Sequence, residues 1–85
     1  MNTYRLIIST PDGNIFDGDV IRIMLRGADG DLAILKDHIP FITSVKPGKC
    51  LIEMPDGEIK MANIESGLLT VSKESVTLLS SSFKF

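Results

Sequence analysis

The sequence has few of the residue types on which enzymatic and metal sites depend. Among its 85 residues are one cysteine, Cys50, one histidine, His38, and no tryptophan. A single cysteine cannot form an internal disulfide, and Cys50 and His38 do not by themselves make a zinc site. No serine lies in a nucleophile elbow beside a candidate base. We therefore expect no catalytic residue, no metal and no cofactor, and we do not expect an enzyme.

Long apolar runs and concentrated positive charge are missing as well. No apolar stretch approaches the roughly 20 residues of a membrane-spanning helix. The first residues, Met1 to Arg5, do not begin a secretory signal, which favours a cytosolic location. The nine basic residues are scattered and the net charge is −2, whereas a protein that binds nucleic acid needs a concentrated basic face. The sequence predicts a soluble cytosolic domain that binds no nucleic acid and no small-molecule substrate.

The length of the chain limits it to a single domain, residues 1–85. A chain of this size buries only about 60–65% of the surface that it exposes when unfolded. Its stability is therefore expected to be modest unless a partner covers part of the remaining surface. The composition thus favours a domain that works in an assembly.

The apolar residues follow a strand pattern and not a helical one, because they alternate or form short blocks that turn residues interrupt. A short additional strand is expected at Ile15 and Phe16. The main predicted strands are Tyr4–Ser9, Val20–Leu25, Leu32–Leu35, Phe41–Val45, Cys50–Met54, Ile59–Ile64, Leu68–Val71 and Val76–Leu79. Eight or nine short strands are too many for one open sheet of this size. The sequence therefore predicts an all-β fold, a two-sheet antiparallel β-sandwich or flattened barrel of about eight to ten short strands.

The turn Pro55-Asp56-Gly57 is typical of a β-hairpin between two alternating strands. In this hairpin the alternation predicts that Cys50, Ile52 and Met54 share one face. On the return strand, the same alternation places Ile59 and Met61 together on the buried face, with Glu58 and Lys60 facing the solvent.

Two loops suggest ligand sites at first sight, but both lack essential ligands. Asp29-Gly30-Asp31 has two carboxylates of a calcium loop without its further oxygen ligands or its bidentate glutamate. Gly27-Ala28-Asp29-Gly30 has neither the spacing of a phosphate loop nor a following helix. Cys50 is expected to be a buried, unreactive thiol because it falls on the inward side of its strand.

The residues from Gly27 to Pro40, GADGDLAILKDHIP, together with Lys46-Pro47-Gly48, resemble the signature of the F-type ATP synthase epsilon subunit. The resemblance continues through the Phe16-Asp17-Gly18 turn and through Glu65–Val71, so that it covers essentially the whole chain. Three positions depart from the family pattern, all within or just before the loop that follows Leu35: Ala33, Lys36 and Asp37. The α-helical hairpin that usually follows the sandwich in this family is absent, which fits either a short epsilon subunit or a shortened form of a longer one.

The resemblance implies a non-catalytic subunit of the central stalk, the rotor of the synthase, which links the gamma subunit to the c-ring. It implies that the subunit couples ion translocation to ATP synthesis or hydrolysis by mechanical contact. It also implies a location in the cytoplasm, peripheral on the inner face of the cell membrane, with no direct insertion into the membrane. The alternative is an unrelated cytosolic β-sandwich module that mediates protein–protein interactions.

The resemblance also implies two groups of contact residues, one for each partner. For the c-ring these are Asp29 and Asp31 of the acidic loop, with His38 nearby. For the gamma subunit they are Thr10, Phe41, Ile42 and Thr43.

Overall fold

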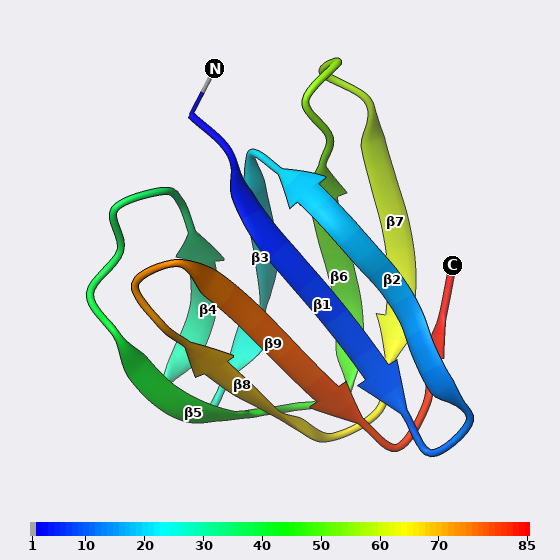
Figure 1. The fold of residues 1–85 in the computed structure, drawn as a ribbon. Helices are drawn as coiled ribbons and strands as arrows, with labels where there is room; N and C mark the ends of the chain where they lie inside the picture. Colours follow the sequence, from blue (N-terminus) through cyan, green and yellow to red (C-terminus); the bar gives the residue numbers. More distant parts are fainter. Residues whose placement is uncertain (1) are drawn as a thin grey trace.

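The computed structural model describes residues 2–85, which form ten strands and no helix (Figure 1). In chain order the strands are β1 (Tyr4–Thr10), β2 (Gly13–Val20), β3 (Arg22–Gly27), β4 (Gly30–Ile34), β5 (Phe41–Val45), β6 (Gly48–Glu53), β7 (Ile59–Ile64), β8 (Gly67–Val71), β9 (Ser75–Ser80) and β10 (Phe83–Lys84). The prediction of an all-β fold of short strands is confirmed. Within residues 2–85 there is accordingly no helix with the length and apolar character needed to cross a membrane.

The strands form two layers that are joined along one side. Hydrogen bonding connects them in the order β10-β7-β6-β3-β5-β8-β9-β1-β2, with β4 on the other edge of β3. The first layer consists of β4, β3, β6, β7 and β10, and the second of β5, β8, β9, β1 and β2. Strands β3 and β5 pair only at Gly27 and Val45, and at this pair the hydrogen-bonded order of strands passes from one layer to the other. The predicted sandwich, or flattened barrel, is therefore confirmed.

One pair of neighbouring strands departs from the expected antiparallel arrangement. Strands β1 and β9 are parallel, with Leu6 opposite Val76 and Ile8 opposite Leu78. Antiparallel neighbours commonly follow from hairpins, which join strands that are adjacent in the sequence. No hairpin links β1 to β9, since most of the chain lies between them. Their relative direction is therefore not constrained by a short connection.

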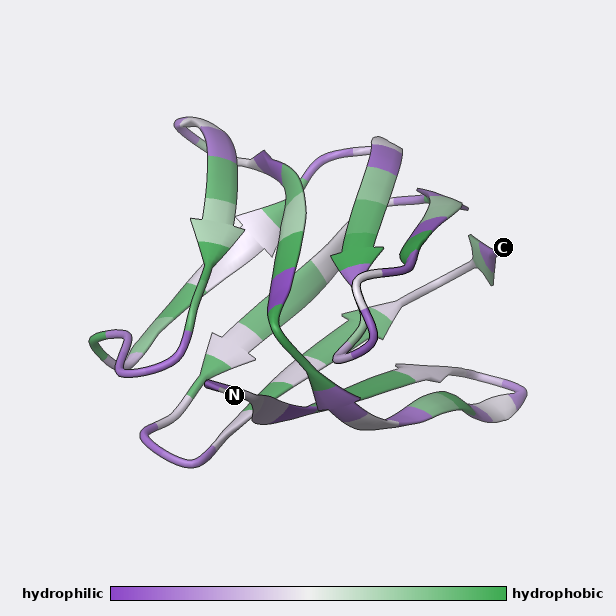
Figure 2. Cartoon of the chain, turned by 90° about the horizontal axis from the view of Figure 1, so that it is seen from above, coloured by the Kyte–Doolittle hydropathy of each residue, from purple (hydrophilic) through white to green (hydrophobic). Residues whose placement is uncertain are grey.

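The core lies between the layers and consists of the inward side of each long strand. In β1, Tyr4, Leu6 and Ile8 point inward, while Arg5 points to the solvent. Burying a side chain such as leucine or isoleucine contributes about 1.5–3 kcal/mol relative to leaving it exposed. Figure 2 shows the resulting pattern, with hydrophobic segments along the strands and hydrophilic ones at many of the turns. The buried apolar residues are Tyr4, Leu6, Ile8, Val20, Ile23, Leu25, Ile34, Val45, Cys50, Ile52, Ala62, Ile64, Leu69, Val71, Val76, Leu78 and Phe83.

Aromatic contacts bring the two ends of the strand order together. Phe85 lies between Phe83 of β10 and Phe16 of β2, with ring centroids 5.0 and 6.4 Å away, respectively. Figure 1 shows the C-terminal residues beside β2. The fold is therefore close to a closed barrel, although β2 and β10 do not pair through their backbones.

One strand was predicted too short, and another was not predicted. The short strand expected at Ile15 and Phe16 is the eight-residue strand β2, which also contains Val20. Its sequence includes two glycines and two aspartates, residues that are depleted in strands, and pairing with β1 overrides this local preference. Strand β10 was not predicted, because two residues are too few to show an alternation.

The predicted β6–β7 hairpin forms, but one of its faces was assigned wrongly. Cys50 and Ile52 are buried as expected. On β7, Ile59 and Met61 face outward and are 45% and 55% exposed, whereas Ala62 is buried opposite Cys50. Because side chains alternate, the inward position of Ala62 and Ile64 forces Ile59 and Met61 to the outside.

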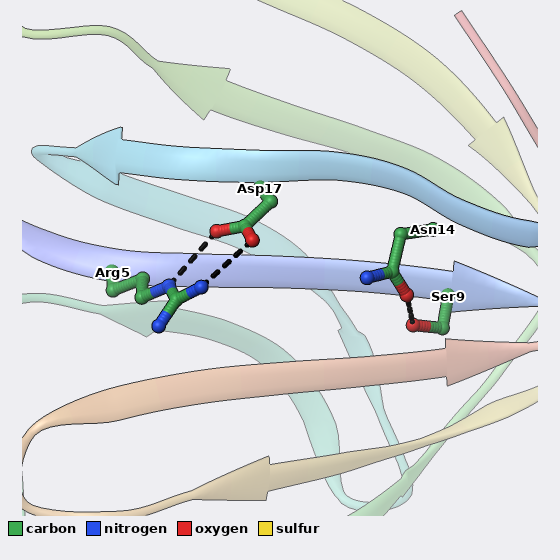
Figure 3. Close-up of polar contacts among 4 residues, drawn as sticks. All are labelled: Arg5, Ser9, Asn14 and Asp17. Carbon is green, nitrogen blue, oxygen red and sulfur yellow. Dashed lines mark hydrogen bonds and ion pairs between the residues drawn. The ribbon is translucent and has the colours of Figure 1, made fainter.

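Polar side-chain contacts accompany the backbone pairing of β1 with the edge strand β2 (Figure 3). The guanidinium of Arg5 donates two hydrogen bonds to the carboxylate of Asp17, at 2.9 and 2.8 Å, and Ser9 donates to Asn14 beside a bulge. The hydrogen bonds from Arg5 lower the pKa of the Asp17 carboxyl. Since the folded-state pKa is lowered, the stabilising effect of this pair is present near neutral pH and is lost as the pH falls through that pKa.

Candidate functional site

The outward side of the second layer carries an exposed aliphatic surface, which we call the β5–β8–β9–β1 face. Three of its side chains are large, apolar and exposed: Ile42 is 66%, Leu68 42% and Leu79 47% exposed. They come from three neighbouring strands, β5, β8 and β9. Large apolar groups gathered in this way mark surfaces that contact another molecule, whereas single exposed apolar residues are ordinary.

Strand register aligns the side chains of this face in two rows. Residues that are directly opposite in a sheet point to the same side, so each row can be followed from β5 to β1. The first row consists of Ile42, Thr70, Thr77 and Ile7. The second row consists of Ser44, Leu68, Leu79 and Ser9. The face therefore combines aliphatic side chains with small hydroxyl groups and carries no charge in either row.

The predicted gamma-contact residues are only partly brought together on this face. Ile42 belongs to it, and Thr10 lies at its border, where it lines a shallow notch with Leu79. On β5, Phe41 and Thr43 point to the opposite side from Ile42, which is the side of the buried Val45. Phe41 is half-buried and packs against the core, which leaves little of its ring for a partner.

Sequence reasoning did not assign Leu68, Leu79, Thr70, Thr77 or Ile7 to a contact surface. A signal for two of them was present in the sequence. The strands that contain Leu68 and Leu79 each have adjacent leucines, so that apolar residues fall on both sides. A strand of this kind must be covered on both faces or leave one apolar face free. In the structure the core covers one side, and the other side remains exposed.

The acidic loop is the β3–β4 turn at one end of the sandwich, shown in Figure 1 where the two strands meet. Asp29 is exposed, and Asp31, whose side chain is 82% exposed, lies 3.4 Å from the guanidinium of Arg26. The backbone N–H of Lys46 donates to the carbonyl of Arg26. This bond places the β5–β6 turn, which carries a positive charge, beside the acidic turn.

We had expected His38 to lie near the acidic turn, and this expectation was wrong. Strand β4 separates the two. Its ring packs edge-on against Tyr4 at the start of β1, with centroids 5.3 Å apart. Both ring nitrogens are buried. Figure 1 shows the loop between β4 and β5, which contains His38, at the other end of the sandwich from the β3–β4 turn.

A second, smaller apolar row lies on the outward side of the first layer. Met24 is opposite Leu51, and Leu51 is opposite Met61, so the three side chains are adjacent across β3, β6 and β7. They line an open groove together with Arg26 and Lys49. This row is bordered by charged side chains.

Within residues 2–85, no three metal-binding side chains are grouped as a metal site requires. Cys50 is fully buried, and burial raises its pKa to about 12. Since the thiolate is the reactive form, we expect Cys50 of the native chain to react with an aromatic disulfide reagent at about pH 8 at least roughly 1000-fold more slowly than in the unfolded chain. The measurement is the reaction rate with and without denaturant. Fast labelling of a chain that still melts cooperatively would contradict the predicted burial.

The described residues thus define a small two-layer β-sandwich with an exposed aliphatic face on its second layer. The sequence matches the family described as "ATP synthase, Delta/Epsilon chain, beta-sandwich domain" over residues 3–85. It is 41% identical over 76 residues to the ATP synthase epsilon chain of Sulfurihydrogenibium sp. (strain YO3AOP1), covering 89% of this chain and 57% of that protein. It is 37% identical over 79 residues to the epsilon chain of Bacillus velezensis (strain DSM 23117 / BGSC 10A6 / LMG 26770 / FZB42), covering 93% and 59%. The chain belongs to this ATP synthase delta/epsilon family, and the alternative of an unrelated sandwich is set aside.

The fold is also similar to chains in two solved assemblies. One is the Euglena gracilis mitochondrial ATP synthase, OSCP/F1/c-ring in rotational state 1, with a TM-score of 0.91 and 20% identity over 98% of this chain and 53% of that chain. The other is the central stalk/c-ring of the Tetrahymena thermophila mitochondrial ATP synthase, with a TM-score of 0.78 and 18% identity over 94% and 64%. The chain spans a little under three fifths of the length of these two relatives.

Proposed function

We propose that this chain is a central-stalk subunit of an F-type ATP synthase, and that it links the gamma subunit to the c-ring on the inner face of the cell membrane. Its role is to couple ion translocation to ATP synthesis or hydrolysis by mechanical contact, without catalysis of its own. The observation that carries the proposal is the match to the family over residues 3–85. The exposed aliphatic face supports it, since a rotor subunit needs a surface that holds a partner firmly.

The gamma subunit is the partner that we assign to the β5–β8–β9–β1 face. Ile42, Leu68 and Leu79 are the largest exposed side chains there, and side chains of this kind supply binding free energy when a partner removes them from water. Tight interfaces have a hydrophobic centre surrounded by polar groups. The row of Leu68 and Leu79 ends in serines on both sides, which matches this arrangement.

The c-ring is the partner that we assign to the end of the sandwich formed by the β3–β4 turn. Asp29 and Asp31 are exposed there, and exposed carboxylates pair with basic groups on polar loops. Such pairs at the edge of an interface affect register and association rate more than affinity. We do not assign His38 to this contact, because the β4–β5 loop that carries it lies at the other end of the sandwich from the β3–β4 turn (Figure 1).

The core of the sandwich suits a part that transmits force. Strand pairing connects all ten strands, and the core packs between the two layers. Closely packed interiors have low compressibility and pass strain on. A load applied at the β3–β4 turn would therefore reach the β5–β8–β9–β1 face through β3 and the Gly27–Val45 pair.

Replacing Asp29 and Asp31 by asparagine is expected to slow association with the assembled c-ring without unfolding the chain. Each residue is exposed, so the free energy of unfolding should change by no more than about 0.5 kcal/mol per substitution. The rate of association should fall, and salt should slow the wild type in the same way by screening the carboxylates. The measurement is the association rate with synthase depleted of this subunit, at low and high salt.

The matched control for this prediction is Asp56→Asn with Glu74→Gln. It makes the same change in charge in turns that precede β7 and β9, at the other end of the sandwich from the β3–β4 turn (Figure 1). Both residues are exposed in these turns. An equal loss of rate in the control would mean that net charge, and not the acidic turn, governs association. Wild-type rates in both variants would remove the acidic turn from the proposed function.

A further inference from the structure

The outward side of the first layer carries a second apolar surface across β4, β3, β6 and β7, which we call the first-layer face. Register aligns four apolar side chains in one row across these strands: Ala33, Met24, Leu51 and Met61. Ala33 and Met61 are exposed, while Met24 and Leu51 are half-buried. The last three line the open groove on this layer. The row is therefore accessible to another molecule.

Positive charge lies along one flank of the apolar row, on the side of the β3–β4 turn. Arg26 of β3 and Lys49 of β6 are exposed and line the groove beside the row. Register continues this flank from Lys49 through Asn63 of β7 to Lys84 of β10. Asp31 of β4 lies opposite Arg26, at 3.4 Å from its guanidinium. Three cations face one carboxylate among these described residues, so the flank has a net positive charge.

The other flank of the apolar row is neutral. Arg22 of β3 and Glu53 of β6 lie directly opposite each other and form an ion pair at 2.7 Å. Ile59 of β7 is opposite Glu53 and is 45% exposed. The charges of the ion pair offset each other, which leaves no net charge for a partner. The first-layer face is thus apolar at its centre and basic on one side only.

The dimensions of the apolar row match those of an α-helix that lies across the strands. Neighbouring strands are about 4.8 Å apart, so the four side chains extend over about 14 Å. A helix advances about 5.4 Å per turn, so apolar residues at i, i+4 and i+7 fall over successive strands. An extended peptide is less suited, because strand addition needs an unpaired sheet edge and this surface is the face of a sheet.

We propose that the first-layer face binds an amphipathic α-helix of a partner chain. The apolar stripe of the helix covers Met24, Leu51 and Met61, and its acidic flank pairs with Arg26 and Lys49. The acidic character follows from charge complementarity, since a basic flank would face like charges. The inference goes beyond the proposed function and does not depend on it. The gamma subunit is assigned to the other layer, so the two partners do not compete for the same side chains.

The test uses a synthetic peptide of about 14 residues as the probe, built on alanine with leucines at i, i+4 and i+7 and glutamates along one flank. A matched peptide has lysines in place of the glutamates. We expect the acidic peptide to shift the methyl resonances of Met24, Leu51 and Met61, with a Kd of about 0.1–1 mM for so small a contact. Those of Ile42 and Leu79 should not change. The lysine peptide should bind at least about tenfold more weakly.

Lys49→Glu reverses one charge of the basic flank. It should weaken binding of the acidic peptide by about fivefold or more and strengthen binding of the lysine peptide. The matched control is Lys73→Glu, which makes the same change in the exposed β8–β9 turn of the second layer and should leave both affinities unchanged. Thermal melts verify that both variants fold. Equal binding of the two peptides, or no shift at Met24, Leu51 and Met61 at about 1 mM peptide, would overturn the proposal.

Two further outcomes would assign the first-layer face to another occupant and would also overturn the proposal. Broadening of the Met24 and Met61 signals with rising concentration of the chain, without peptide, would mean that a second copy covers the face. Binding of the chain to phosphatidylglycerol vesicles that is lost in Lys49→Glu would mean that the face contacts an anionic membrane surface. We expect neither result, since the wild-type signals should depend only on the acidic peptide.

Discussion

Leu68→Glu combined with Leu79→Lys is expected to abolish measurable binding of the gamma subunit while the chain stays folded. The two leucines are directly opposite each other on β8 and β9, and both are more than 40% exposed. In the free chain the new side chains can form a cross-strand ion pair, so the sheet is retained. In the complex, the same charges would be removed from water in the centre of an apolar contact, which is strongly unfavourable.

We expect this double substitution to weaken binding by at least about 1000-fold, which corresponds to about 4 kcal/mol. Calorimetric titration of the chain with the gamma subunit measures the change, and a thermal melt verifies the fold. The matched control is Leu51→Glu with Met61→Lys, which places the same opposite pair on the outward side of the first layer. Wild-type affinity in the Leu68/Leu79 variant, or an equal loss in the control, would refute the assignment of the face.

Gly67→Ala is expected to destabilise the chain strongly, because there is no space for a methyl group at this position. A Cβ at Gly67 would collide with the backbone carbonyl of Leu79 and lie 3.1 Å from the Cα of Ser80. These are backbone atoms of the paired strand β9, so they cannot move aside as a flexible side chain could. We expect the free energy of unfolding to fall by about 2–4 kcal/mol, a large part of the total for a domain of this size.

Urea unfolding followed by circular dichroism measures this loss, and Gly18→Ala is the control. At Gly18 the nearest atoms to a new Cβ belong to the side chain of Phe16, at an ordinary contact distance of 3.6 Å. That variant should therefore lose less than about 1 kcal/mol, mostly through local strand preference. If Gly67→Ala were as stable as the wild type, the close approach of β8 to β9 would be wrong.

Much of the fold could be predicted from the sequence because local patterns determine it. Alternation and turn residues gave the observed bounds of β5 and β7, and those of β1 to within one residue. The errors arose where pairing with a distant strand decides the outcome. Strand β2 contains residues that disfavour strands, and it forms because its backbone pairs with β1 along its length. The parallel pairing of β1 with β9 could not be predicted, since no local signal links two segments so far apart in the chain.

The candidate site was less predictable, because it consists of residues that become neighbours only through register. Ile42 could be assigned from family resemblance, yet its position beside Thr70 follows from the pairing of β5 with β8. The phase of a strand is also hard to determine when apolar residues occur on both sides, as at Met61. For His38, the sequence shows a polar residue before a proline and does not reveal that Tyr4 packs against its ring.

The most direct test of the proposed function is to map the surface that the gamma subunit covers. Amide and methyl resonances of the labelled chain are recorded before and after the gamma subunit encoded with it is added. The account predicts that the methyl signals of Ile42, Leu68 and Leu79 shift or broaden, whereas those of Met24 and Met61 on the other layer do not. The opposite pattern, with changes confined to Met24 and Met61, would contradict the proposed orientation of this subunit.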